Sequence, residues 1–143
     1  MSSSSEGTSR ESALLVVRRY AWAFDAQDSA ALGELFTDDV RLEFVAEGGE
    51  WFSSQGLPAV LSMLEGSMRS EVRTRHLFTN ELSSVNAAGE YEVDVYFLLV
   101  LRGARWAPAS SGTYRFTVRP TPVGWRICRM VNHLDKVLDL DGS

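Results

Sequence analysis

The sequence predicts an α+β fold, in which three helices from the first half of the chain cover one face of a curved, mostly antiparallel sheet. Apolar residues recur at helical spacing in three segments before residue 70, and they alternate with polar residues over long stretches after residue 73. With 143 residues and 45% hydrophobic content, the chain is long enough for one domain with a real core. The expected boundaries are a disordered tail at 1–8, a single domain at 9–134 and a loose C-terminal tail at 135–143.

Capping signals place the helices. Thr8 and Glu11 form a capping box, in which a hydroxyl is followed three residues later by a carboxylate, so the first helix should begin there. Asp28 or Ser29 can cap a second, short helix, and Pro58 can occupy the first turn of a third. The expected helices cover residues 9–27, 30–36 and 58–70.

Strands are expected where β-branched and aromatic residues alternate with polar ones between turn residues. The long run at 90–102 has apolar residues at its odd positions, while Leu98 and Val100 make its even face mixed. Residues 103–111 are interpreted as a loop, because they contain Gly103 and Pro108. The expected strands cover residues 40–45, 51–53, 73–85, 90–102, 112–119 and 125–132.

The composition argues against several functional classes. A net charge of -5 at pH 7 disfavours nucleic acid and anionic membranes as partners. The single cysteine, Cys128, allows no internal disulfide and no cysteine-based zinc site, and two histidines far apart without clustered acids argue against any metal. No apolar run approaches transmembrane length, and Met1 to Thr8 is too polar for a signal peptide, so we expect a soluble, cytoplasmic protein.

His76 is the residue around which a catalytic site can be built. Alternation in the strand at 73–85 places His76, Phe78, Asn80 and Leu82 on one face, which should point inward because it is apolar. A histidine is the side chain best suited to moving a proton near neutral pH. The structural alternative is a core histidine satisfied by a neighbouring hydroxyl or carbonyl.

Asp25 is the expected partner of His76. It lies roughly 20° from Leu14 around the axis of the first helix, in the middle of the apolar stripe, where a carboxylate needs a cation or a hydrogen-bond donor. Arg18 could be that partner and would make the site structural. We expect His76 instead, at about 2.6–3.2 Å between heavy atoms, because each group is costly to bury alone.

Other side chains could bind a substrate in a largely apolar pocket. Asn80 and Tyr96 could supply hydrogen bonds to a carbonyl or enolate, although a satisfied strand amide and an outward-facing tyrosine are the structural alternatives. Arg129 should share a strand face with Trp125 and Ile127, where it could hold an anion or form an internal salt bridge. The expected substrate-binding residues are Asn80, Tyr96, Tyr114, Trp22, Phe78, Arg129 and Tyr20.

A series of short segments carries a family resemblance. The segments are Arg19-Tyr20-Ala21 with Asp25 and Asp28, Leu35 to Val40, Thr74-Arg75-His76 with Thr79-Asn80, Gly112-Thr113-Tyr114, and Gly124 to Ile127 with Arg129. Their order resembles the SnoaL-like branch of the nuclear transport factor 2-like superfamily. The resemblance implies a cone-like α+β barrel with a deep pocket between the helices and the concave sheet, usually in a homodimer. Polyketide cyclases, scytalone dehydratase and ketosteroid isomerase are members, as are many non-catalytic proteins.

The resemblance to scytalone dehydratase implies a role for the expected pair. That enzyme uses an Asp at the end of its first helix to orient a His on the strand after the third helix, and Asp25 and His76 occupy those places. Its tyrosine before that Asp is Phe24 here. The base of ketosteroid isomerase would fall near Phe44, and its tyrosine matches Tyr20, which lies off the apolar stripe.

The sequence and the resemblance together predict a cofactor-independent cyclase, dehydratase or isomerase of natural product biosynthesis. His76 and Asp25 would perform general acid/base chemistry on a polyketide-like or polycyclic small molecule, without metal or organic cofactor. A non-catalytic binding module and an assembly subunit of the same fold are the alternatives. A homodimer through the outer face of the sheet is expected, because Leu98 and Val100 need a second covered surface.

Overall fold

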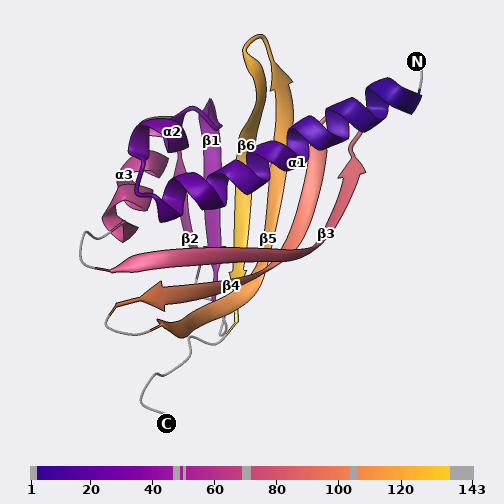
Figure 1. The fold of residues 1–143 in the computed structure, drawn as a ribbon. Coiled ribbons are helices and arrows are strands. Elements are labelled where there is room, and N and C mark those ends of the chain that lie inside the picture. Colours follow the sequence, from indigo (N-terminus) through magenta and orange to yellow (C-terminus); the bar gives the residue numbers. More distant parts are fainter. Residues whose placement is uncertain (1–2, 47–48, 50, 69–71, 104–105, 136–143) are drawn as a thin grey trace.

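The computed structural model describes residues 3–46, 49, 51–68, 72–103 and 106–135. Within these residues, three helices lie against one face of a six-stranded sheet, which confirms the α+β class (Figure 1). The helices are α1 (Ser3–Asp25), α2 (Ser29–Gly33) and α3 (Leu57–Ser67). The strands are β1 (Phe36–Val45), β2 (Trp51–Gln55), β3 (Arg73–Val85), β4 (Tyr91–Arg102), β5 (Trp106–Thr121) and β6 (Gly124–Leu134). No helix in the described part of the chain is long and apolar enough to cross a membrane.

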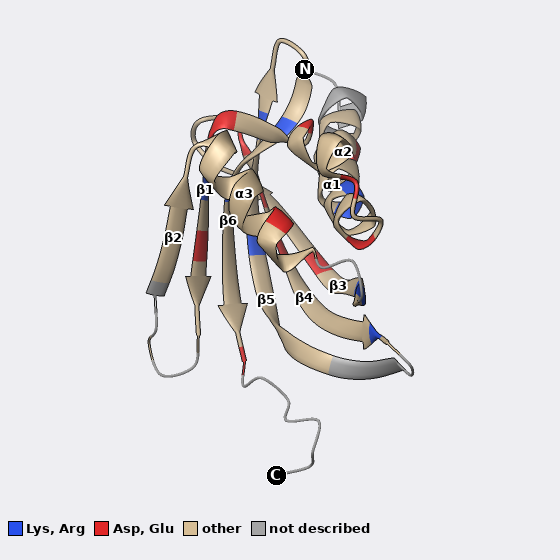
Figure 2. Ribbon diagram, turned by 90° about the vertical axis from the view of Figure 1, so that its left-hand side faces the viewer, with Lys and Arg blue, Asp and Glu red and all other residues tan. Residues whose placement is uncertain are grey.

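The sheet is mostly antiparallel, as expected. Its strand order is β2-β1-β6-β5-β4-β3, and only the pairing of β1 with β6 is parallel. The long strands bend around α1, and all three helices lie on the same side of the sheet (Figures 1 and 2). The concave face of the sheet and the helices therefore enclose a common interior.

The hydrophobic core fills most of this interior. Val17 and Tyr20 of α1 are buried against the sheet, together with Val60 and Leu64 of α3. The odd positions of β4 point inward, as the alternation in the sequence predicts. The apolar inner-face strand residues that are at most 2% exposed are Val40, Leu42, Val93, Val95, Phe116, Val118, Ile127 and Met130.

A β-bulge in β3 changes which side chains share a face of the strand with His76. The register between β3 and β4 shifts between Thr79 and Leu82, and Asn80 adopts a left-handed φ of 58°. Asn80 and Leu82 consequently line a cavity on the outer face of the sheet, and Leu82 is 72% exposed. The expectation that they share the inward face with His76 is therefore wrong, because the bulge interrupts the alternation.

A second irregularity reverses the faces of β6. Ile127 and Arg129 pair with adjacent residues of β5, so that Cys128 is the extra residue of a bulge. Arg129 therefore points to the outer face, whereas Met130 and Asn132 point into the core. The expectation that Arg129 shares a face with Ile127 is corrected for this reason.

Some element boundaries also differ from those expected. Helix α1 begins at Ser3, upstream of the expected cap at Thr8, so the predicted tail is helical where it is described. Strand β1 begins at Phe36, four residues before its expected start at Val40. Asp28 caps α2 as expected, because its side chain accepts a hydrogen bond of 3.0 Å from the backbone N–H of Ala31. The remainder of the two expected tails, residues 1–2 and 136–143, lies outside the described residues.

Strand β5 begins at Trp106, inside the segment expected to be a loop. Pro108 pairs opposite Val100 of β4, next to a register shift between Leu99 and Val100. The pairing of β5 with β6 starts only at Gly112, so Pro108 has a neighbouring strand on one side alone. A proline is compatible with a strand at such a position, because it does not interrupt a second ladder of hydrogen bonds.

Gly112→Ala should destabilise the protein by more than about 3 kcal/mol. A Cβ atom at this position would lie 2.0 Å from the carbonyl oxygen of His133 and 2.9 Å from Cε1 of Phe97. Gly66→Ala is the matched control, because a Cβ there meets nothing within 4 Å and should stabilise α3 by up to about 1 kcal/mol. Urea unfolding measures both changes, and wild-type stability of Gly112→Ala would contradict the close approach of β5 to β6.

Candidate functional site

The carboxylate of Asp25, the last residue of α1, is bound to β3 by three hydrogen bonds. Its Oδ1 lies 2.7 Å from Nδ1 of His76 and accepts a hydrogen bond of 2.9 Å from the hydroxyl of Thr74. Its Oδ2 accepts the backbone N–H of His76 at 2.8 Å. The expected contact between Asp25 and His76 is thus confirmed. Arg18 instead binds Glu81 at 3.2 Å, so the alternative pairing with Asp25 is not formed.

This geometry sets the tautomer of the His76 imidazole. A carboxylate can only accept hydrogen bonds, so Nδ1 of His76 carries a proton and Nε2 of the neutral ring is left as a lone-pair acceptor. A carboxylate at the C-terminal end of a helix is disfavoured by the helix dipole, and the three donors offset that cost. The side chain of His76 is only 4% exposed and that of Asp25 16%, which keeps the pair largely shielded from water.

Aromatic rings surround the imidazole and fix its position. The ring centre of Phe24 lies 4.8 Å from that of His76, in an edge-on arrangement. The rings of Tyr20 and Phe78 lie at 6.1 Å and 6.0 Å. Tyr20 is 2% exposed and lies at the centre of this cluster, although its position off the apolar stripe of α1 gave no sign of such burial.

His76 lines a cavity of about 310 Å³ between the helices and the concave face of the sheet. Its wall is mostly aromatic and aliphatic, with a few polar groups contributed by α1, α3, β3, β5 and β6. The lining residues are Tyr20, Phe24, Phe44, Leu64, Ser67, Val72, Thr74, His76, Phe97, Leu99, Leu101, Ser110, Tyr114, Asn132 and Leu134. We call this space the inner cavity. A small apolar molecule with one or two polar groups suits such a wall.

The phenols of Tyr20 and Tyr114 are the principal hydroxyl groups of the inner cavity. Burial raises the pKa of both far above that of an exposed tyrosine. Hydrogen bonds from Tyr20 and Asn132 lower the pKa of Tyr114, but by less than burial raises it. Both hydroxyls therefore stay protonated at neutral pH. The hydrogen bond between them raises the pKa of Tyr20, so Tyr20 is its donor, and the O–H of Tyr114 is the one that can donate to an oxygen of a bound molecule.

Asn132 is a site residue that the sequence interpretation missed. It is 2% exposed, lines the inner cavity, and its side-chain Oδ1 has no hydrogen-bond partner. Simple alternation along β6 from Ile127 places it on the wrong face, because the bulge at Cys128 is not visible in that pattern. Met130 and Leu134, two positions before and after Asn132, also face inward. A polar residue between two apolar residues at this spacing is the signal that could have identified Asn132.

A second cavity, of about 440 Å³, is lined by both residues of the pair. It lies between α1 and the edge strand β3 and is lined by Asp25, His76, Trp22, Arg73 and other residues. Trp22 is 79% exposed here and does not belong to the wall of the inner cavity. His76 therefore lines both cavities, whereas Asp25 lines only the second.

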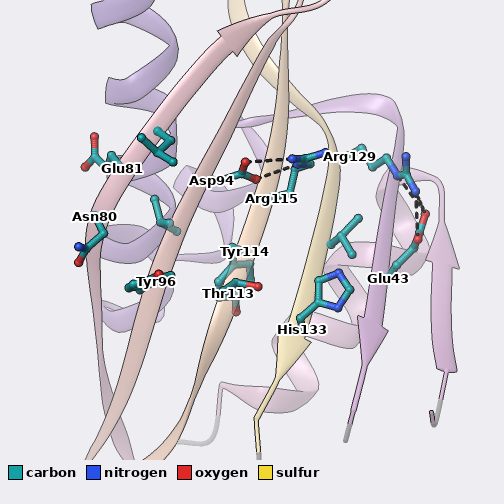
Figure 3. A pocket seen from close by; sticks show the side chains of 13 residues that line it. Glu43, Asn80, Glu81, Asp94, Tyr96, Thr113, Tyr114, Arg115, Arg129 and His133 are labelled. Carbon is teal, nitrogen blue, oxygen red and sulfur yellow. Dashed lines mark hydrogen bonds and ion pairs between the residues drawn. The ribbon is translucent and has the colours of Figure 1, made fainter.

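Three of the expected substrate-binding residues lie on the outer face of the sheet instead (Figure 3). Asn80, Tyr96 and Arg129 line a cavity of about 820 Å³ there, with Tyr96 59% exposed. Arg129 binds the buried carboxylate of Glu43 through two hydrogen bonds of 3.0 Å and 3.2 Å. Arg129 thus forms the salt bridge that was its structural alternative. Of the other expected residues, Tyr20 and Tyr114 line the inner cavity, and Phe78 packs against both.

The described residues contain no group of three or more His, Cys, Asp and Glu side chains that could hold a metal ion. His133, the second histidine, lies on the outer face of the sheet and lines the cavity of about 820 Å³ there (Figure 3).

The fold and the sequence define the family. Residues 6–131 match the family described as the SnoaL-like domain, and the chain belongs to it. The SnoaL-like resemblance is thereby confirmed, and the fold is shared with a solved NTF2-like protein. No curated protein matches the sequence significantly.

Solved structures share the whole fold. A protein described as a candidate scytalone dehydratase from Novosphingobium aromaticivorans is 19% identical, with a TM-score of 0.80 over 96% of this chain and 91% of the other. ActVI-ORFA from Streptomyces coelicolor is 16% identical, with a TM-score of 0.74 over 87% and 96%. An NTF2-like protein with a cystatin-like fold from Novosphingobium aromaticivorans is 23% identical, with a TM-score of 0.72 over 95% and 84%. At these identities the similarity is one of fold.

The buried tyrosines should make the protein sensitive to alkali. Since their pKa values are raised by folding, their contribution to stability is complete below about pH 10 and is lost as the pH rises further. Each should lower the free energy of unfolding by about 1.4 kcal/mol per pH unit in that range. Urea titrations between about pH 9 and pH 11 measure this slope.

Tyr114→Phe should reduce this dependence of the unfolding free energy on pH by the contribution of one tyrosine, about 1.4 kcal/mol per pH unit. Tyr96→Phe, at an exposed position, is the control and should leave the slope unchanged. An equal slope in wild type and Tyr114→Phe would mean that this phenol already ionises in the folded protein.

Proposed function

We propose that the protein is a cofactor-independent enzyme of the cyclase, dehydratase or isomerase type, with His76 as general acid/base and Asp25 as its orienting partner. The observation that carries the proposal is the 2.7 Å contact between Asp25 and Nδ1 of His76 on the wall of the inner cavity. Nε2 is then left to exchange a proton with a bound molecule. Membership of the SnoaL-like family supports a reaction of this class. The class of substrate is part of the same proposal.

The reaction would begin with removal of a proton from a carbon next to a carbonyl group. Nε2 of His76 accepts this proton, and the electron pair of the C–H bond moves to the carbonyl oxygen as an enolate. The protonated hydroxyl of Tyr114 is a donor that can stabilise the enolate oxygen, and Tyr20 supports it by donating its own O–H to Tyr114. The imidazolium, stabilised by Asp25, then returns the proton to carbon, which gives isomerisation, or to a leaving β-hydroxyl, which releases water.

The inner cavity favours an apolar, ring-containing substrate. Five of its residues are phenylalanine or tyrosine and come from different parts of the fold: Tyr20, Phe24, Phe44, Phe97 and Tyr114. A volume of about 310 Å³ lies at the lower end of the range for small-molecule sites, which suits a compact bicyclic or tricyclic molecule. A polyketide-like or polycyclic carbonyl compound is therefore the proposed substrate class.

Exchange of the α-hydrogens of β-tetralone for deuterium tests the proposed base. This bicyclic ketone has acidic C–H groups and fits the proposed substrate class, so the wild-type protein should accelerate its exchange in D₂O. His76→Ala should reduce the acceleration by roughly 10²–10⁴-fold, the usual contribution of a positioned base. Asp25→Asn should cause a smaller loss, because the ring keeps a neighbour but becomes less basic. Proton NMR follows the exchange.

His133→Ala is the matched control, because it removes the other histidine from the outer face. It should leave the exchange rate unchanged. Folding of each variant is checked by circular dichroism and thermal unfolding. If wild-type protein binds β-tetralone without accelerating exchange, the enzyme proposal fails and the chain is a binding module. If His76→Ala is folded and fully active, His76 is not the base.

We also propose that the protein forms a homodimer through the outer face of the sheet. This face carries exposed Tyr96 and Leu98 together with both signs of charge, from Asp94, Arg115 and Glu81 among others. A two-fold axis brings each patch against its own copy, so a surface carrying both charges can be self-complementary.

Sedimentation velocity should give twice the monomer mass of 15.9 kDa at micromolar concentration. Leu98→Asp should shift the protein toward monomers, whereas Leu15→Asp, at an exposed site on α1, should not. A monomeric wild-type protein would contradict the proposal.

A further inference from the structure

Three arginines line the second cavity, the space of about 440 Å³ between α1 and β3. Arg73 pairs directly with Arg102 across β3 and β4, and Arg75 follows two residues later in β3. All three therefore belong to one face of the two strands, where β3 starts and β4 ends (Figure 2). Like charges directly opposite one another on neighbouring strands are destabilising, so an anion bound between them would offset a repulsion built into the sheet.

The wall of the second cavity has an excess of positive charge. Among the described residues that line it, Asp25 is the only acidic one, and it stands against three arginines. Its carboxylate already accepts three hydrogen bonds from Thr74 and His76, so it is occupied within the protein. A guanidinium group stays charged at any ordinary pH and matches the geometry of a carboxylate with two parallel N–H donors. The wall therefore favours an oxyanion as ligand.

The size and the setting of the second cavity restrict this anion to a small molecule. The chain as a whole has a net charge of -5, so its overall field disfavours nucleic acid and other polyanions. The positive charge where β3 starts is a local exception to that field. A volume of about 440 Å³ lies within the usual range for small-molecule sites and holds a compact ligand.

Trp22 adds an aromatic surface to the same cavity. It lies on α1, lines the second cavity and is 79% exposed. Ala21 and Ala26 line the cavity with small side chains, which leave room for a ligand on the helix side. A planar ring that packs on the indole would remove apolar area of both from water. The second cavity therefore joins an aromatic surface to a group of cations, the two features that an aromatic carboxylate needs in a binding site.

We propose that the second cavity binds a small aromatic carboxylate. The carboxylate accepts hydrogen bonds from the guanidinium groups of Arg73 and Arg102, and the ring packs against Trp22. Arg75 adds positive charge on the same strand face. None of these four residues lines the inner cavity, so the site is separate from the proposed reaction. The inference therefore does not depend on His76 acting as a base.

Two ligands of the same shape test the role of charge. 2-Naphthoate carries a carboxylate where 2-naphthamide carries a neutral amide, so the ratio of their dissociation constants isolates the effect of the charge. The wild-type protein should bind 2-naphthoate about tenfold more tightly, the contribution of one charge-assisted hydrogen bond. Calorimetric titration measures both constants. Raising the salt concentration from about 0.05 M to about 0.5 M should reduce the preference, because salt screens exposed charges.

Variants of the wall assign the two halves of the ligand. The double variant Arg73→Gln/Arg102→Gln should lower the preference for 2-naphthoate below about threefold, because one arginine of the three remains. Trp22→Ala should weaken the binding of both ligands by the same factor, about three- to tenfold, because it removes packing and leaves the charge. The matched control Arg10→Gln/Arg19→Gln removes two exposed charges of α1 outside the cavity wall and should keep the preference.

NMR signals of the indole N–H groups show where the ligand binds. The signal of Trp22, assigned with Trp22→Phe, should shift on addition of 2-naphthoate. Three results would each overturn the inference: equal wild-type affinities for the two ligands, a preference unchanged in Arg73→Gln/Arg102→Gln, or a Trp22 signal unmoved at saturation. None of these measurements requires turnover. Their failure would leave the proposed reaction of His76 standing, and a failure of the β-tetralone exchange would leave this inference standing.

Discussion

The carboxylate of Asp25 fixes the edge strand β3 to the end of α1. Its three donors, at 2.7 Å, 2.8 Å and 2.9 Å, come from Thr74 and from both the backbone and the ring of His76. Strand β3 has β4 as its sheet neighbour on one side only, so these hydrogen bonds replace part of the support that a second strand would give. The same contact that closes the fold at this edge also sets the orientation of the imidazole. The structure at this edge and the proposed chemistry of His76 therefore depend on one side chain.

This contact was predictable from the sequence because Asp25 and His76 are both polar residues at positions where an apolar residue is expected. A carboxylate in the middle of an apolar helical stripe and a histidine on an apolar strand face both need a partner in the interior. The helix must cover the face from which His76 points, so the two groups meet. The fold class was predictable for a related reason, since long alternating strands follow a helical first half.

The remainder of the candidate site depended on two bulges that alternation cannot reveal. One turns Asn80 outward, and the other turns Arg129 outward while bringing Asn132 into the cavity. A single inserted residue changes the face of every later side chain in a strand. Tyr20 illustrates a different difficulty, because the strongly curved sheet wraps far enough around α1 to bury a position beside its apolar stripe. Neither the bulges nor the curvature has a local sequence signature in this chain.

The parallel pairing of β1 with β6 has a consequence for how the protein is made. Glu43 and Arg129, which join these strands by their side chains, are separated by 86 positions in the sequence. A ribosome adds residues from the N-terminus onward, so β1 must wait for nearly the whole domain to be synthesised before its neighbour exists. Contacts of such long range slow folding, because the closure of a large loop precedes any gain from pairing. The helices and the first hairpin can form early, whereas the cavity acquires its last wall only when β6 is added.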